Sequence, residues 1–321
     1  MRPPLLGVQA GATARRRGGV SVSEIGVLSQ SRFHYAHGMQ LGHMRWGKMK
    51  PMRQWYLRSS SILIVAAVPL VIASCATPDM PDDTPQPPVE RLVAEVQERF
   101  DFDPSSFTQG LELAPDNTLY VGTGRIGESR IYRRTLDGNE VASRTLDPAF
   151  FGEGITRVDA SVWQLTWQHG VAMKRDAESL EETGRAFYAG EGWGLCYRPA
   201  ANEVILSDGS AQLRRMDPFT FEERERFTVT LDNEPVTQLN ELECVGDDVY
   251  ANIFTTTDIV RIDASSGMVT AVIDAASVPN NADPDPDNVL NGIAHIPGTD
   301  EFYLSGKRWP DLYRVRFVPA G

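Results

Sequence analysis

From residue 90 to the end of the chain, hydrophobic and polar residues alternate in short runs that Gly, Asp and Asn interrupt. This two-residue period is typical of half-buried β-strands, and no stretch keeps the 3.6-residue period of an amphipathic helix. Residues 177–183 come nearest to a helix, of one or two turns. The pattern therefore predicts an all-β domain over residues 90–321.

The strands of this domain recur in similar units. Each unit opens with a pair of small, polar or aromatic residues and an aliphatic one: Gln109-Gly110-Leu111, Glu153-Gly154-Ile155, Trp193-Gly194-Leu195, Asn240-Glu241-Leu242 and Asn291-Gly292-Ile293. Successive openings lie 44, 40, 47 and 51 residues apart. Because repeats of this length that contain only strands are typical of propeller blades, five units predict a five-bladed β-propeller. We expect a strand at residues 91–99 to complete the last blade. A β-sandwich is the alternative.

The first strand of each propeller blade lines the central tunnel, so the residues that open the units are predicted to converge on one axis. They are Gln109, Glu153, Trp193, Asn240 and Asn291. Polar and aromatic groups gathered in a concave mouth indicate a binding site for a small ligand.

The segment before the domain has a different composition. Residues 1–74 hold ten basic residues and one acidic residue, and four of the basic residues directly precede an uncharged apolar run at residues 62–73. This order is typical of a secretory signal, and the run is too short to span a bilayer. It ends Ile72-Ala73-Ser74-Cys75, which resembles a bacterial lipobox. We therefore predict a lipoprotein signal peptide at residues 49–74, lipidation of Cys75 and a periplasm-facing lipoprotein of the bacterial cell envelope. A buried helix with a chance cysteine is the alternative.

Residues 75–89 are rich in Pro and Asp, which predicts a stiff, solvated linker between the anchor and the domain. Residues 1–48 have no role in this arrangement. We interpret them as an over-long gene model or a disordered extension, since Met44, Met49 and Met52 are alternative starts.

Net charge and cysteine content exclude several classes of protein. The whole chain carries a formal net charge of -12, but a chain that begins at Cys75 has 21 basic and 42 acidic residues, a net charge of -21. Such an acidic domain argues against nucleic-acid binding. Three cysteines without a C-x-x-C or H-E-x-x-H motif indicate neither a disulfide scaffold nor a zinc site. For Cys196 and Cys244, predicted on adjacent inner strands, two buried thiols are favoured over a disulfide.

Seven motifs resemble those of the plant and bacterial glutaminyl-peptide cyclotransferases, which are five-bladed propellers unrelated to the animal zinc enzymes. They lie in order at residues 107–111, 151–156, 165–167, 191–195, 207–210, 239–243, and 290–294 with 305–310. The resemblance extends over about residues 90–318. It implies an enzyme that closes the N-terminal glutamine of peptides or proteins into pyroglutamate, releases ammonia and requires no cofactor.

The resemblance also implies which residues act in the reaction. It places the catalytic acid and base on Glu153, whose neighbours Gly152 and Gly154 would let the substrate approach closely. Lys307 and Asn240 would hold the γ-carbonyl oxygen or its developing charge. Structural roles are the alternatives: a carboxylate that accepts backbone N–H bonds, a solvated strand-end lysine and a turn asparagine.

The substrate-binding residues expected from the same resemblance are Phe107, Gln109, Trp167, Trp193, Phe254, Asn291 and Trp309. The aromatic side chains would wall a flat, water-poor slot, although aromatic residues on propeller strands more often pack in the core. Phe254 stands where the family is expected to have tryptophan, which would affect affinity more than chemistry.

Two other functions stay open at this point. A calcium-dependent propeller lactonase or esterase would surround its ion with acids and amides, for which the chain offers Glu153, Asn240, Glu241 and Asn291. Residues 279–287 are a second run that could hold a structural calcium ion, with a solvated loop as the alternative. A non-catalytic envelope propeller that binds peptides is the other function. In each case we expect a monomer that contacts the membrane only through its lipid.

Overall fold

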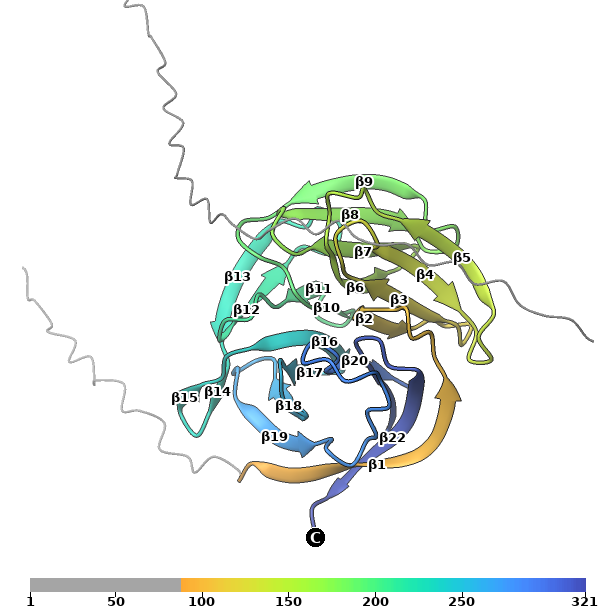
Figure 1. Ribbon diagram of the computed structural model, residues 1–321. Helices are drawn as coiled ribbons and strands as arrows, with labels where there is room; N and C mark the ends of the chain where they lie inside the picture. The colour runs from red at the N-terminus through yellow and green to blue at the C-terminus, as the bar shows by residue number, and fades with distance from the viewer. Residues whose placement is uncertain (1–87) are drawn as a thin grey trace, which may run out of the picture. The chain divides into compact units, whose positions relative to one another are not determined.

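The structure is a computed structural model that describes residues 88–321 (Figure 1). The predictions for residues 1–48, for the signal peptide at 49–74 and for Cys75 lie outside the described residues, as does most of the linker. From residue 88 onward the chain forms 22 strands and no α-helix. Residues 177–183, the nearest approach to a helix in the sequence, form a turn and the start of a strand. The all-β prediction is confirmed.

Three sheets each contain four antiparallel strands in chain order. The first consists of β2 (Thr108–Leu113), β3 (Leu119–Thr123), β4 (Arg130–Arg134) and β5 (Glu140–Thr145). The second consists of β6 (Gly152–Val158), β7 (Ser161–Thr166), β8 (Val171–Asp176) and β9 (Glu182–Phe187). The third consists of β10 (Leu195–Arg198), β11 (Glu203–Leu206), β12 (Gln212–Met216) and β13 (Glu223–Thr228). A short hairpin of β14 (Thr230–Leu231) and β15 (Glu234–Pro235) follows.

The remaining strands form one sheet of eight, in the order β16-β17-β18-β19-β1-β22-β21-β20. Its strands are β16 (Leu239–Val245), β17 (Asp248–Ile253), β18 (Asp258–Asp263), β19 (Val269–Asp274), β20 (Leu290–His295), β21 (Glu301–Gly306), β22 (Asp311–Pro319) and β1 (Glu90–Asp101). β1 pairs antiparallel with β22 along most of its length, and parallel with β19 only at its first four residues. The N-terminal strand therefore joins the last strands of the chain, as predicted.

The first strand of each repeat unit lies at the centre of the molecule (Figure 1). β2 contacts β6 and β20, β10 contacts β6 and β16, and β16 contacts β20, so these five strands close a ring. The buried hydrophobic clusters lie between neighbouring groups of strands: Ile155 of β6 packs with Tyr120 of β3, and Leu165 of β7 packs with Leu206 of β11. A sandwich would bury one core between two sheets. The arrangement is propeller-like instead.

The glycines beside Glu153 are required by this crowded ring. A Cβ atom added to Gly154 would lie 2.6 Å from the carbonyl oxygen of Trp193, and one added to Gly152 would lie 2.5 Å from that of Thr123. Both distances are shorter than side-chain carbons tolerate. These glycines therefore let strands pack closely, whereas the sequence assigned them to close approach of the substrate.

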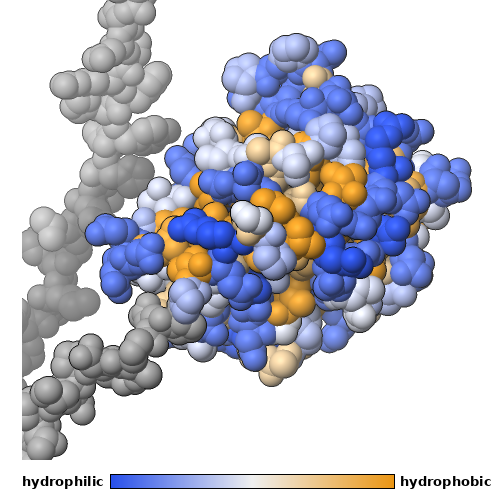
Figure 2. Space-filling model, turned by 90° about the horizontal axis from the view of Figure 1, so that it is seen from below, coloured by the Kyte–Doolittle hydropathy of each residue, from blue (hydrophilic) through white to orange (hydrophobic). Residues whose placement is uncertain are grey.

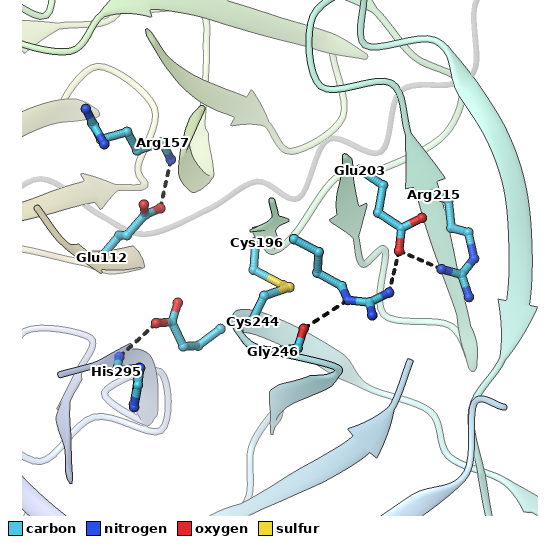
Figure 3. The surroundings of a disulfide bond; sticks show 10 residues. Glu112, Arg157, Cys196, Glu203, Arg215, Cys244, Gly246 and His295 are labelled. Atoms are coloured by element: carbon cyan, nitrogen blue, oxygen red, sulfur yellow. Dashed lines mark hydrogen bonds and ion pairs between the residues drawn. A yellow bond between two sulfur atoms is a disulfide. The ribbon is translucent and has the colours of Figure 1, made fainter. Parts of the chain in front are cut away.

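A disulfide joins Cys196 on β10 to Cys244 on β16 (Figure 3). The preference for two free thiols was therefore wrong. The two residues occupy neighbouring inner strands with their Cα atoms 5.3 Å apart, within the range that a disulfide spans. Near it, Glu112 accepts a hydrogen bond from the backbone N–H of Arg157 at 2.8 Å, which links two sheets.

The face drawn in Figure 2 mixes hydrophilic and hydrophobic residues. Seen from below in Figure 2, hydrophilic residues cover much of the face, with hydrophobic residues between them. No helix in residues 88–321 has the length and apolar character of a membrane span.

Candidate active site

A cavity of about 250 Å³ lies at the end of the ring where the first strands of the units begin and where β7, β17 and β21 end. It is lined by Phe107, Gln109, Phe151, Glu153, Trp167, Trp193, Asn240, Phe254, Asp287 and Lys307. Eight of these ten were expected from the sequence to act in catalysis or substrate binding. A larger hollow of about 520 Å³, beside Glu90 and Arg261, contains none of the expected site residues. The smaller cavity is therefore the candidate site.

Glu153 projects from β6 with 5% of its surface exposed. Its Oε1 atom accepts a hydrogen bond from Nε2 of Gln109 at 3.0 Å. Burial raises the pKa of its carboxyl group well above the usual value, the Lys307 charge opposes this rise, and the Glu191 charge adds to it. A carboxyl group with a raised pKa can both give and take a proton near neutral pH.

A second buried glutamate on the same ring is held differently. The two carboxylate oxygens of Glu241 accept backbone N–H bonds from Leu111 of β2 at 3.1 Å and Ile293 of β20 at 2.8 Å. Glu241 thus has the structural role that was the alternative for Glu153. Within the described chain, Glu153 accepts no backbone N–H bond, so its carboxyl group is free to serve a ligand.

Gln109 is held in turn by Asn291. Nδ2 of Asn291 donates to Oε1 of Gln109 at 3.0 Å and to the backbone oxygen of Thr108 at 3.0 Å. The Asn291 side chain is fully buried and lies outside the cavity lining. The structure therefore places Asn291 behind Gln109, where it fixes the amide that contacts Glu153.

Lys307 follows β21 and is 4% exposed. Its Nζ atom lies 4.5 Å from the ring centroid of Phe254 and 5.1 Å from that of Phe107. Burial lowers the pKa of its ammonium group, and the charges of Glu153 and Asp287 oppose this effect. Within residues 88–321 no carboxylate oxygen lies within 4 Å of Nζ, so the ammonium group can donate to a ligand. Asn240 of β16, 3% exposed, also presents its amide to the cavity.

Aromatic rings form the walls. Trp193 and Phe254 meet edge to face at 5.5 Å between ring centroids, and Trp167 meets Phe151 in the same way at 5.6 Å. Phe151 also contacts Phe107 edge to face. These contacts create a narrow apolar slot that ends at polar groups, the usual composition of a small-molecule site.

Sequence reasoning missed three residues at the site. Phe151 and Asp287 line the cavity, and Glu191 accepts hydrogen bonds from the indole N–H groups of Trp167 and Trp193. Phe151 and Glu191 lie inside motifs that carried the family resemblance, so those motifs held a signal that was not used. Asp287 was considered only as part of a calcium-binding run.

Trp309 lies away from the cavity lining, although it was expected to bind substrate. Its ring is 3% exposed in the core cluster of the eight-stranded sheet, and its Nε1 donates to the carbonyl oxygen of Asn288 at 3.2 Å. The structure gives this indole packing contacts next to Lys307 in the chain.

No group of three or more His, Cys, Asp or Glu side chains in residues 88–321 is arranged to hold a metal ion. In the run at residues 279–287, Asp285 accepts the backbone N–H of Asp287 and faces Arg308, so its oxygens have partners in the chain. Of the four residues offered for a lactonase ion, Glu241 and Asn291 use their side chains inside the ring. The other two, Glu153 and Asn240, line the cavity.

Together the site holds an uncommitted carboxyl group, a buried ammonium group and two amides at the end of an apolar slot. This set can move a proton and stabilise negative charge on an oxygen atom. It contains no serine or cysteine placed as a nucleophile among the lining residues. Reactions in which the substrate supplies its own nucleophile fit this chemistry best.

Comparisons with known proteins agree with this chemistry. The sequence profile of the glutamine cyclotransferase family matches residues 66–317. The glutaminyl-peptide cyclotransferase of Arabidopsis thaliana is 31% identical over 232 residues, which cover 70% of this chain and 72% of that protein. The crystal structure of Myxococcus xanthus glutaminyl cyclase matches with a TM-score of 0.68 and 31% identity, over 73% of this chain and 100% of that one. From the matched profile and these two relatives, we conclude that the chain belongs to the glutamine cyclotransferase family.

Proposed function

We propose that this protein is a glutaminyl-peptide cyclotransferase, which converts the N-terminal glutamine of peptides into pyroglutamate and releases ammonia. Membership of the family supports the reaction. The single observation that supports the assignment of the site is the buried Glu153, whose only hydrogen bond within the described residues comes from a side-chain amide. The cavity of about 250 Å³ is slightly smaller than most small-molecule pockets, in keeping with one amino-acid side chain as its ligand.

The first requirement of the reaction is proximity. The α-amine and the γ-carbonyl carbon belong to the same residue, so the slot has only to fold the glutamine side chain back until the two atoms meet. The aromatic walls formed by Trp167, Trp193 and Phe254 would hold this pose and exclude water. Such positioning is worth a large part of the barrier in intramolecular reactions.

The second requirement is proton transfer. The amine nitrogen forms a bond to the side-chain carbonyl carbon (Cδ) of the glutamine, and the bond from that carbon to the amide nitrogen breaks, which releases ammonia. We assign to Glu153 the transfer of a proton from the attacking amine to the leaving nitrogen. An α-amine has a pKa of about 8, so a carboxyl group whose pKa is raised by burial exchanges protons with it more readily than an exposed one.

The third requirement is stabilisation of the negative charge that develops on the side-chain amide oxygen of the substrate glutamine. We assign this to the Lys307 ammonium group and the Asn240 amide, which both line the cavity. One donor aimed at such an oxygen lowers the barrier by about 3 kcal/mol. Gln109, fixed by Asn291, would orient Glu153 and the substrate amide.

We also infer that the eight-stranded sheet consists of two blades, which makes five in all. In support, β1 pairs with β19 only over Glu90–Val93 but with β22 over nine residue pairs. A crystal structure tests the count. Two four-stranded blades separated between β19 and β1 would support it, and a continuous eight-stranded sheet would contradict it.

We further propose that the enzyme is an exported lipoprotein anchored through Cys75. The basic and apolar order of residues 48–75 supports export. A disulfide between Cys196 and Cys244 is compatible with an oxidising compartment.

The catalytic proposal is tested by ammonia release from a Gln-Ala dipeptide. Wild type should release ammonia with or without EDTA, and Glu153→Gln should lose most of its turnover while it keeps its circular dichroism spectrum. Glu128→Gln is a matched control, because Glu128 is an exposed carboxylate outside the cavity lining. Turnover retained in Glu153→Gln would show that the assignment is wrong.

A further inference from the structure

Glu191 lies in the loop between β9 and β10, which joins the second sheet to the third. The loop is held rigidly around it. Gly190 has a φ of 78°, which favours glycine, and a Cβ atom on Gly192 would lie 2.5 Å from the Tyr188 hydroxyl oxygen. The backbone N–H of Gly192 donates to the carbonyl oxygen of Trp167 at 3.1 Å.

The Glu191 carboxylate accepts three hydrogen bonds. Its Oε2 atom accepts the indole N–H of Trp167 at 2.8 Å and that of Trp193 at 2.9 Å. Its Oε1 atom accepts from Nε2 of Gln168 at 2.9 Å. One oxygen therefore fixes two aromatic walls of the cavity, one directly after β7 and one shortly before β10. Bonds to an ionised acceptor are about twice as strong as neutral ones.

This arrangement also determines what the tryptophans can offer a ligand. Indole has one hydrogen-bond donor, and in both rings Glu191 already accepts it. The substrate therefore meets only ring faces and edges. Trp167 is 37% exposed, so without Glu191 little besides its edge contact with Phe151 would keep its ring in place.

Glu191 also acts through its negative charge, which affects the pKa of Glu153. Burial raises the pKa of Glu191, but the hydrogen bonds from Trp193, Gln168 and Trp167 lower it by more, so the group is ionised at neutral pH. The charges that act on Glu153 are Lys307, which stabilises its ionised form, and Glu191, which disfavours it.

We propose that Glu191 is a positioning residue of the cyclotransferase: its carboxylate holds the indole rings of Trp167 and Trp193 as the two walls between which the glutamine side chain lies. The substrate in this inference rests on the proposed function, whereas the hydrogen-bonded clamp itself does not. Glu191 does not line the cavity, so it acts through the two rings.

The experiment uses full-length protein with the substitutions Glu191→Ala and Glu191→Gln, and Glu128→Gln as the control for loss of a surface carboxylate. The first readout is the NMR resonance and hydrogen exchange of the two indole N–H groups, assigned with Trp167→Phe and Trp193→Phe. The second is kcat and KM for a glutaminyl dipeptide across pH.

In Glu191→Ala, we expect both indole resonances to shift, their exchange to accelerate and kcat/KM to fall about tenfold, because misplaced walls disturb the reactive pose. Glu191→Gln keeps one acceptor oxygen, so its decrease in kcat/KM should be smaller than that of Glu191→Ala. Removal of the negative charge should lower the pKa of Glu153 and move its limb of the pH profile to lower pH. Glu128→Gln should change none of these readouts.

Unchanged indole resonances in Glu191→Ala would overturn the clamp, whether or not the protein cyclises glutamine. Shifted resonances with unchanged kinetics would overturn the positioning role. A wild-type protein that releases no ammonia would instead contradict the proposed function, and the resonances would then still test the clamp.

Discussion

At the scale of single residues, the site depends on how each buried charge is satisfied. Glu241 gives both oxygens to backbone N–H groups of two neighbouring strands, whereas Glu153 receives one side-chain amide and faces the cavity. Burial raises the pKa of both carboxyl groups, but only that of Glu153 faces the cavity, where a raised pKa suits an acid and base. Lys307 is also held away from water, among aromatic rings and near that carboxyl group.

The substitution Lys307→Met tests the oxyanion assignment. We expect kcat to fall by about 10²-fold to 10³-fold, the usual cost of removing one such donor, with a smaller change in KM. Loss of the ammonium charge should also raise the pKa of Glu153 further, since Lys307 lowers it. The corresponding limb of the pH profile should therefore move to higher pH, opposite to the shift in Glu191→Gln.

The matched control is Lys174→Met, because Lys174 on β8 packs over Trp163 outside the cavity lining. Its kcat should stay close to that of wild type. A Lys307→Met enzyme with wild-type kcat would refute the role of Lys307.

At the scale of elements, the inner strands carry Gln109, Glu153 and Asn240 of the site, and a disulfide ties two inner strands together. Cys196 and Cys244 close a loop with a sequence separation of 48 residues between β10 and β16. In the chain-entropy account, a cross-link of this length stabilises the fold by about 4 kcal/mol. Since neither cysteine lines the cavity, the bond should affect stability and leave catalysis unchanged.

We therefore expect Cys196→Ala/Cys244→Ala to unfold at a clearly lower urea concentration than the oxidised wild type, with kcat/KM for a glutaminyl dipeptide unchanged. Reduction of wild type with dithiothreitol should give the same shift in the urea midpoint. An identical midpoint for the oxidised, reduced and substituted proteins would contradict a stabilising disulfide.

The elements also show what the sequence could predict. The repeat of unit openings located Gln109, Glu153, Trp193 and Asn240, because the first strand of each unit lies in the same place in the ring. Side chains at strand ends and in loops have no such period. Trp309 therefore packs into the core instead of the cavity, and Glu191 was overlooked. The pairing of Cys196 with Cys244 depends on the spacing of two inner strands, which hydrophobic alternation does not specify.

At the scale of the whole molecule, the charge of the domain would oppose the proposed attachment to a membrane. A chain that begins at Cys75 carries a net charge of -21, which repels an anionic membrane surface. A covalent lipid would have to hold such a domain at the membrane against that repulsion. The Pro-rich and Asp-rich residues 75–89 would keep it at a distance.

The substitution Cys75→Ser tests the proposed lipid anchor at Cys75. In fractionated cells, wild type should be found in the membrane fraction and Cys75→Ser in the soluble fraction, since an acidic domain is repelled by anionic lipid. Ammonia release per molecule should be equal in the two. The anchor proposal fails if wild type is soluble or if Cys75→Ser stays with the membrane.

In the proposed mechanism, buried Glu153 transfers the proton that lets N-terminal glutamine close on itself without a metal ion. The most direct measurement is the rate of ammonia release from Gln-Ala, with and without EDTA, by wild type, Glu153→Gln and Glu128→Gln. We expect equal rates for wild type and Glu128→Gln, no effect of EDTA, and loss of nearly all turnover in a folded Glu153→Gln protein. Persistent turnover in Glu153→Gln, or loss of wild-type turnover in EDTA, would show that this mechanism is wrong.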